Sequence, residues 1–193
     1  TVKRDGSNNY EQIREFSAER PVVTLTSLVE GLHGVAVDDE AGGCLAARHL
    51  AECGHRKLAT LGGSRMYKRC QYFAKEAQRL GAEVSAFKHI EDIAPAIRDF
   101  TAVFCFSDMK ALELYKFCAE AGVHIPADLS VIGYDNLLFT DLMLPSLTTI
   151  HQPKRDLGRE TGKLVLKALA DKKMPPEQIK LPPELILRAS TGG

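Results

Sequence analysis

The sequence predicts an α/β fold built on parallel sheet. Short apolar runs alternate along the 193 residues with stretches in which apolar side chains recur every three or four positions. Alternation of this kind is typical of strands joined by right-handed helical crossovers. The composition agrees with a folded globular protein, because 45% of the residues are hydrophobic and 26% are charged.

The expected strands are the short apolar runs. In chain order they are PVVTL (21–25), GVAV (34–37), KLATLG (57–62), EVSAF (83–87), TAVFCF (101–106), LSVIG (129–133) and SLTTI (146–150). The later stretch QIKLPPELILR (178–188) is expected to be extended chain.

Helices are expected between these runs, over 40–53, 67–80, 90–99 and 108–121, and from 153 onward. Ala46, Leu50 and Cys53 share one face of the first of these helices. Glycines follow three of the helices and are a usual C-terminal signal. Pro153 suits the first turn of the last helix, where its missing N–H costs nothing.

Charge and cysteine content limit the classes of protein. Lysine plus arginine equals aspartate plus glutamate at 25 each, so this chain is not expected to hold DNA by itself. No apolar run approaches the roughly 20 residues of a membrane span, and TVKRDGSNNYEQ has no apolar core of a signal peptide. Five cysteines without a spacing pattern favour reduced thiols in the cytoplasm.

Polar residues collect where the expected strands end. In open α/β sheets, ligands bind at the carboxyl ends of the strands. The residues that follow strands there include Asp38 and Asp39, Arg69, Ser107 and Asp108, Tyr134 to Asn136, and His151 and Gln152. Carboxylates, an arginine, a serine and amides at one end of a sheet could bind a polyhydroxyl ligand.

Several of these residues have a simpler interpretation as helix caps. The sole role of Asp38 or Asp39, and also of Asp108, could be to cap the helix that follows. Such a cap stabilises a helix by about 0.5–2 kcal/mol. Asp135 precedes no clear helix, so ligand contact is the favoured interpretation there. Arg69 falls inside an expected helix, where it could equally be solvated.

The sequence gives little support for catalysis, a metal or a cofactor. Gly62-Gly63 belongs to no recognisable phosphate-binding motif, and no G-x-S-x-G or H-E-x-x-H is present. His49 and Cys53 lie one helical turn apart, but two metal ligands without a third are weak evidence. We therefore expect a protein that is not an enzyme, with neither a metal nor a cofactor.

Five stretches together resemble a known family. They are VAVDDEAGGCLAARHLAECGHRKLATLGG, AVFCFSDMKAL, GVHIPADLSVIGYDN, LPSLTTIHQPKRDLGRETGKLVL and LPPELILRAST. In this order and spacing they resemble the effector-binding core of LacI/GalR-type transcriptional regulators, from about Val35 onward.

The resemblance implies a periplasmic-binding-protein-like type I fold. Two α/β lobes would be joined by three crossovers, with a small effector in the cleft, and the protein would be a homodimer. We expect residues 1–53 and 151–170 in the first lobe, and residues 54–150 and 171–193 in the second. The family's helix-turn-helix DNA-binding part is expected to be absent from this chain, and its operator DNA would be bound through that part.

The resemblance also implies site residues. Asp38 matches the aspartate that ends a first-lobe strand, and Arg69 matches the arginine that clamps effector hydroxyls or carboxylate. Ser107 and Asp108 follow the strand of the SDMKAL stretch, and Asp135 is the aspartate of GYDN. Gln152 ends TIHQ at a crossover.

Departures from the family pattern leave alternatives open. The loop between Gly63 and Arg69 is short, Tyr72 and Glu113 replace smaller residues, and the first lobe is expected to be incomplete. The favoured function is a sugar-sensing, dimerising regulator domain. The alternatives are a periplasmic sugar-binding protein of the same fold, an enzyme, and a regulator domain that has lost its effector.

Overall fold

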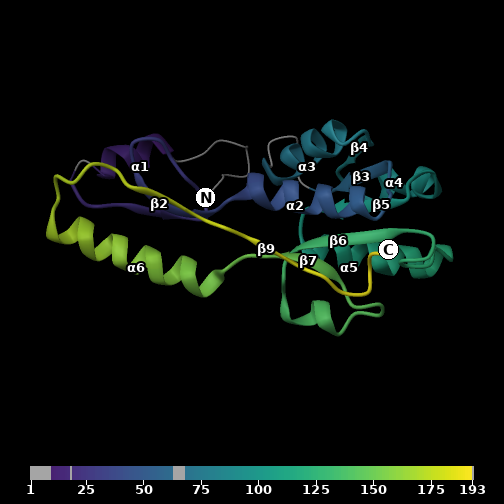
Figure 1. Ribbon diagram of the computed structural model, residues 1–193. Helices are drawn as coiled ribbons and strands as arrows, with labels where there is room; N and C mark the ends of the chain where they lie inside the picture. The colour runs from purple at the N-terminus through teal and green to yellow at the C-terminus, as the bar shows by residue number, and fades with distance from the viewer. Residues whose placement is uncertain (1–9, 18, 63–67, 193) are drawn as a thin grey trace. The chain divides into compact units, whose positions relative to one another are not determined.

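The computed structural model describes residues 10–17, 19–62 and 68–192, which fall into two compact units. The smaller unit comprises Thr1–Asp38 and Pro153–Pro182, and the larger unit comprises Asp39–Gln152 and Pro183–Gly193 (Figure 1). None of the helices in the described part of the chain is both long and apolar enough to cross a membrane.

The smaller unit contains a three-stranded parallel sheet in the order β1-β2-β8. Its elements are α1 (Tyr10–Ser17), β1 (Val23–Leu25), β2 (His33–Val37), α6 (Lys154–Ala170) and β8 (Gln178–Leu181). Helix α6 lies along this sheet (Figure 1) and buries Leu157 and Leu164 against Val35 of β2. The periodicity from residue 153 onward predicted this helix, whereas α1 was not predicted.

The larger unit contains a six-stranded sheet in the order β4-β3-β5-β6-β7-β9. Its strands are β3 (Lys57–Leu61), β4 (Glu83–Phe87), β5 (Ala102–Cys105), β6 (Ser130–Asp135), β7 (Thr148–His151) and β9 (Glu184–Ile186). All neighbours are parallel except β7 and β9, which pair antiparallel. The parallel sheet was therefore correctly predicted but for its last edge strand, β9, which pairs antiparallel with β7.

Helices cover both faces of this sheet. They are α2 (Asp39–Glu52), α3 (Lys68–Arg79), α4 (Ile90–Ile93), η1 (Ala94–Asp99), α5 (Asp108–Ala121) and η2 (Leu138–Asp141). On one face α2 and α3 pack against Leu58, Phe104 and Ile132. On the other face α5 and η1 pack against Val103 and Val131. Alternate residues of the central strands thus serve two cores, as period-2 geometry requires.

The boundary between the units lies elsewhere than the sequence indicated. The resemblance implies that the helix at 40–53 belongs to the first lobe, but α2 buries Ala46, Ala47 and Leu50 in the core of the larger unit. Residues 171–182 were assigned with the second lobe, but β8 pairs with β2 in the smaller unit. Helical periodicity tells which face is buried and not which sheet covers it. The short loop expected between Gly63 and Arg69 includes 64–67, which lie outside the described residues.

Helices α2 and α3 approach closely at Gly43. A Cβ atom at Gly43 would lie 2.4 Å from the carbonyl oxygen of Arg69 and 2.8 Å from the backbone nitrogen of Phe73.

We therefore expect Gly43→Ala to lower the free energy of unfolding by about 1–3 kcal/mol, because backbone atoms must move apart. Gly158→Ala is the matched control, since nothing lies within 4 Å of its Cβ position on α6. It should raise stability by up to about 1 kcal/mol. Urea unfolding measures both, and equal effects would contradict the close packing.

An ion-pair network also joins these two helices. Glu76 of α3 accepts from Arg48 of α2 at 2.7 Å and from Arg79 at 2.7 and 2.9 Å. The hydrogen bonds from Arg79 and then Arg48 lower the pKa of Glu76 from 4.5 to about 2. Because the folded-state pKa is the lower one, this stabilisation is present above pH 4.5 and is lost as the pH falls toward 2.

We expect Glu76→Gln to flatten the pH dependence of the unfolding free energy across that window. Urea titrations at several pH values test this, and an unchanged slope would contradict it.

Candidate functional site

The candidate site lies in the larger unit, where α2 and α3 begin and β6 ends. Arg69, in the first turn of α3, is its central residue. Its Nε lies 3.2 Å from Asp39 Oδ1, and its Nη1 lies 3.7 Å from Asp135 Oδ1. Nη1 also donates to the carbonyl oxygen of Phe106 at 3.1 Å. One guanidinium therefore joins the ends of three elements, and the side chain is only 15% exposed.

Two aromatic rings fix the plane of the Arg69 guanidinium. Its Cζ lies 3.8 Å from the ring centroid of Tyr134 and 4.9 Å from that of Phe106. The Tyr134 hydroxyl donates to Asp39 Oδ1 at 3.2 Å, and burial raises the pKa of this phenol, so it stays protonated. Gly42 leaves room for the ring, because a Cβ there would lie 2.5 Å from the Tyr134 hydroxyl. The cation–π contacts and the carboxylates together hold Arg69 in one orientation.

Asp135 ends β6 in an unusual backbone conformation. Its φ is 114°, and that of Asn136 is 50°, in a region that residues other than glycine seldom occupy. Such residues cost about 1–3 kcal/mol each and cluster at functional sites. The Asp135 carboxylate accepts a hydrogen bond from Gln152 Nε2 in addition to its contact with Arg69. Three of the predicted residues, Arg69, Asp135 and Gln152, are thus brought together.

Asp108 has a different place from the one the sequence indicated. Its side chain is fully buried; its Oδ2 accepts from the Leu137 N–H at 2.8 Å, and its Oδ1 accepts from the Thr149 hydroxyl at 2.6 Å. Gly133 leaves space for this carboxylate, since a Cβ there would lie 2.3 Å from Oδ1. Asp108 therefore positions the chain after Asp135 and presents no surface to a ligand.

Ser107 is the N-cap of α5. Its backbone is extended, and its hydroxyl accepts from the Lys110 N–H at 3.3 Å. The sequence suggested Asp108 as a possible cap of this helix, but the cap is Ser107. Ser107 is half-buried at the end of β5, next to Phe106.

Asp38 lies in the smaller unit, whereas the other five predicted residues lie in the larger one. It follows β2, and its N–H donates to the Leu181 carbonyl oxygen at 2.9 Å. Its neighbour Asp39 contacts Arg69, as Asp135 does. The motif alone favoured Asp38, and it gave no signal for the aromatic contacts of Phe106 and Tyr134.

Metal ligands do not gather in the part of the chain that is described. Among those residues, no group of three or more histidine, cysteine, aspartate or glutamate side chains could hold a metal ion. His49 and Cys53 do meet, with Sγ 3.7 Å from Nε2, but the same nitrogen lies 3.0 Å from the Thr191 hydroxyl. All five cysteines are free thiols.

A pocket of about 180 Å³ lies elsewhere, in the smaller unit. Its lining includes Arg20, His33 and Lys172. Val22 and Leu32 in its wall directly precede β1 and β2, so it lies at the amino ends of those strands. Ligands of α/β sheets bind at the opposite, carboxyl ends.

Sequence comparison gives one family match. Residues 47–191 match the family described as a periplasmic binding protein-like domain. The chain is 33% identical over 168 residues to an HTH-type transcriptional repressor PurR of Photobacterium profundum, covering 78% of this chain and 50% of that protein. It is 33% identical over 203 residues to a repressor of the same name from Vibrio cholerae, covering 95% and 60%. The chain thus spans half to three-fifths of these two relatives.

Solved structures agree with the fold. A LacI family transcriptional regulator from Enterococcus faecalis with bound ribose is 32% identical, with a TM-score of 0.84. The match covers 98% of this chain and 75% of that one. A LacI family regulator from Enterococcus faecium, also with bound ribose, is 28% identical with a TM-score of 0.82 and coverages of 98% and 76%. The predicted fold class is confirmed by these matches.

Proposed function

The chain belongs to the periplasmic-binding-protein-like family, as an effector-binding domain of the LacI/GalR type, and on this premise we propose that it senses a sugar. The sugar binds where Arg69, Asp135 and Gln152 meet. The observation that carries this proposal is the guanidinium of Arg69, held against two aromatic rings and two carboxylates at the carboxyl end of the sheet.

The chemistry of this corner suits a polyhydroxyl ligand. The carboxylate of Asp135 accepts hydrogen bonds from vicinal hydroxyls, and the guanidinium of Arg69 donates to hydroxyl and ring oxygens. The ring of Phe106 offers an apolar surface for sugar C–H groups. Ser107 follows β5, the strand next to β6, and is proposed to add a contact, while Asp108 holds the backbone after Asp135 in place. The ribose bound in two of the similar regulators supports this ligand class.

The proposed output is control of transcription. Binding of the sugar changes the affinity of a separate helix-turn-helix part for operator DNA, with a coupling of about 1–3 kcal/mol as is typical of allosteric proteins. The relatives named above are repressors and regulators, which supports a sensor and not an enzyme. A role on DNA places the protein in the cytoplasm.

A homodimer is part of this proposal, because regulators of this type work as dimers on operators with two-fold symmetry. The segment after β6 exposes three leucines, Leu138, Leu142 and Leu144, at 97%, 80% and 93%. Exposed apolar groups gathered on one segment mark an interaction surface, and a two-fold dimer uses the same patch on both copies.

We expect Leu142→Asp together with Leu144→Asp to convert dimer to monomer, because each charge would be buried in the contact. Sedimentation velocity measures the change. The matched control is Leu166→Asp, at an exposed position on α6 in the smaller unit. A dimer that survives the double replacement would contradict the assignment of this patch.

Thermal unfolding against a panel of sugars, sugar phosphates, nucleosides and purines tests the sensing function. A ligand that binds only the folded state adds about 2.7 kcal/mol at a hundredfold excess over its Kd. We expect one sugar to raise the unfolding temperature, and Asp135→Asn to abolish that shift. If no compound shifts a well-folded sample, the chain does not sense these small molecules.

A further inference from the structure

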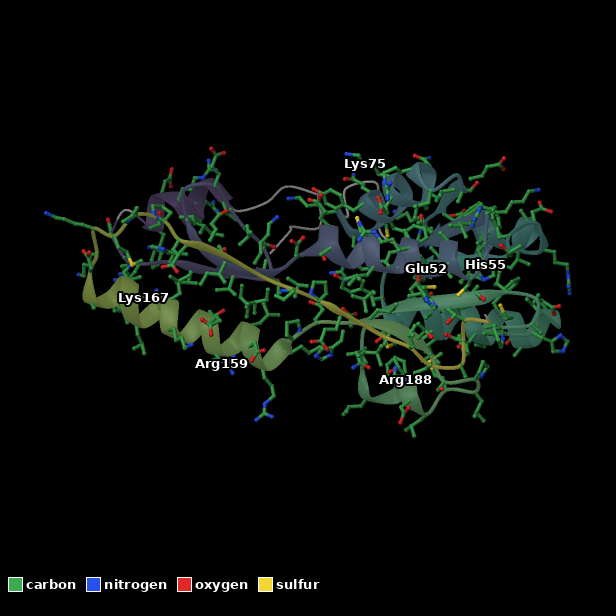
Figure 2. All side chains as sticks on the ribbon, viewed as in Figure 1. Glu52, His55, Lys75, Arg159, Lys167 and Arg188 are labelled. Carbon is green, nitrogen blue, oxygen red and sulfur yellow. The ribbon has the colours of Figure 1, made fainter. Side chains whose placement is uncertain are left out.

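Arg188 joins three parts of the larger unit through one guanidinium. Its Nη2 donates to Asn136 Oδ1 at 2.9 Å, and its Nη1 donates to the Leu147 carbonyl oxygen at 2.7 Å and to the Thr140 hydroxyl at 3.2 Å. Its Nε lies 3.4 Å from Asp141 Oδ1. Figure 2 shows Arg188 just after β9, beside the segment that contains η2. The side chain is only 16% exposed, so these bonds are largely shielded from water.

On one side of Arg188 is the candidate site. Asn136 directly follows Asp135, and both residues have positive φ. Two further groups of Asn136 also have partners: its Nδ2 lies 3.2 Å from His151 Nδ1, and its N–H donates to the Thr149 hydroxyl oxygen at 3.3 Å. A change in the backbone of Asp135 therefore changes the acceptor that Arg188 holds.

On the other side is the segment 137–147, called here the leucine loop. It contains η2 and the exposed Leu138, Leu142 and Leu144. One of its internal hydrogen bonds, from the Leu147 N–H to the Thr140 carbonyl oxygen at 2.9 Å, joins its two ends. Arg188 contacts both residues of that closure, through the Thr140 hydroxyl and the Leu147 carbonyl.

We infer that Arg188 is a positioning residue that couples the backbone at Asp135 to the conformation of the leucine loop. The planar guanidinium is suited to this, because its donors have fixed relative directions and it holds Asn136 and Leu147 at a set separation. A change at the site then reaches the exposed leucines through one side chain. The inference rests on the proposed function only for the identity of Asp135 as part of a ligand site.

Hydrogen–deuterium exchange of the leucine-loop amides tests this coupling without any ligand. Four forms of the chain are compared: the original, Asp135→Asn, Arg188→Gln and the double variant. We expect Asp135→Asn to speed exchange in 137–147 by about fivefold or more, the lower end of allosteric coupling factors. In the Arg188→Gln background the same change should have no further effect. Arg188→Lys should behave like Arg188→Gln, since an ammonium group lacks the fork of donors.

A purely structural role gives a different result. It predicts that the two replacements act independently, so that their effects on exchange multiply in the double variant, and this outcome would overturn the inference. Arg159→Gln is the matched control, an arginine with surface ion pairs in the smaller unit, and it should leave the Asp135→Asn effect unchanged.

A second variant removes the contact between Arg188 and Asn136 by changing Asn136. Asn136→Gly removes the acceptor of Arg188 Nη2, and glycine adopts a φ of 50° without steric strain. It should likewise cancel the Asp135→Asn effect; if it leaves that effect intact, the coupling does not run through Arg188. Because the cycle contains no ligand, a failed sugar panel and a failed coupling are separate results.

Discussion

Replacing Arg69 with alanine is expected to weaken sugar binding by roughly 30-fold or more, since removing one member of a buried charge pair costs about 2–5 kcal/mol. Arg69 contacts Asp39, Asp135 and the Phe106 carbonyl together. Without it both carboxylates lose their contact with this cation, and the stack on Tyr134 is lost. Isothermal titration calorimetry with the sugar found by thermal unfolding measures the effect.

Arg69→Lys separates charge from geometry. A lysine keeps the positive charge but loses the planar fork, so binding should recover only in part. Arg79→Ala is the control. Like Arg69, Arg79 lies on α3 and pairs with a carboxylate, that of Glu76, but it is well exposed and contacts none of the site residues described above. Equal losses for Arg69→Ala and Arg79→Ala would show that binding does not depend on the geometry of the site.

Replacing Asp108 with alanine is expected to lower the free energy of unfolding by about 3 kcal/mol, because it leaves buried donors without an acceptor. The Leu137 N–H and the Thr149 hydroxyl both donate to this carboxylate. Leu137 directly follows the strained residues Asp135 and Asn136, so sugar binding should weaken too. Urea unfolding gives the stability change.

Asp156→Ala is the matched control for Asp108. Asp156 pairs with Arg159 on the surface of α6, and exposed pairs contribute about 0–1 kcal/mol. If Asp108→Ala costs no more than this control, the carboxylate does not hold the chain after β6 in place.

Much of the fold could be predicted from local sequence. The apolar runs at 57–61, 102–105 and 130–135 form the centre of the large sheet, and Gly122 ends α5 with a φ of 63°. Period-2 and period-3.6 patterns report which residues are buried, and these patterns are local. The region expected as one helix at 90–99 instead divides into α4 and η1 at Pro95.

The rest depends on contacts that are distant in sequence. Nothing near Arg188 indicates that it donates to Asn136, 52 residues away. The sequence alone does not distinguish Asp38 from its neighbour Asp39, yet only Asp39 belongs to the larger unit, which contains Arg69. Asp108 follows a strand as a ligand-binding residue would, and burial under Leu137 and Thr149 gives it another role. Residue type and strand end identify the candidates, and packing decides among them.

A crystal structure of the chain grown with the sugar that gives the largest thermal shift tests the central claim most directly. The account predicts sugar hydroxyls within about 3 Å of the Asp135 carboxylate and of Arg69, with the sugar ring against Phe106. A sugar found elsewhere, for example in the pocket of the smaller unit, with Arg69 and Asp135 paired as they are here, would contradict it.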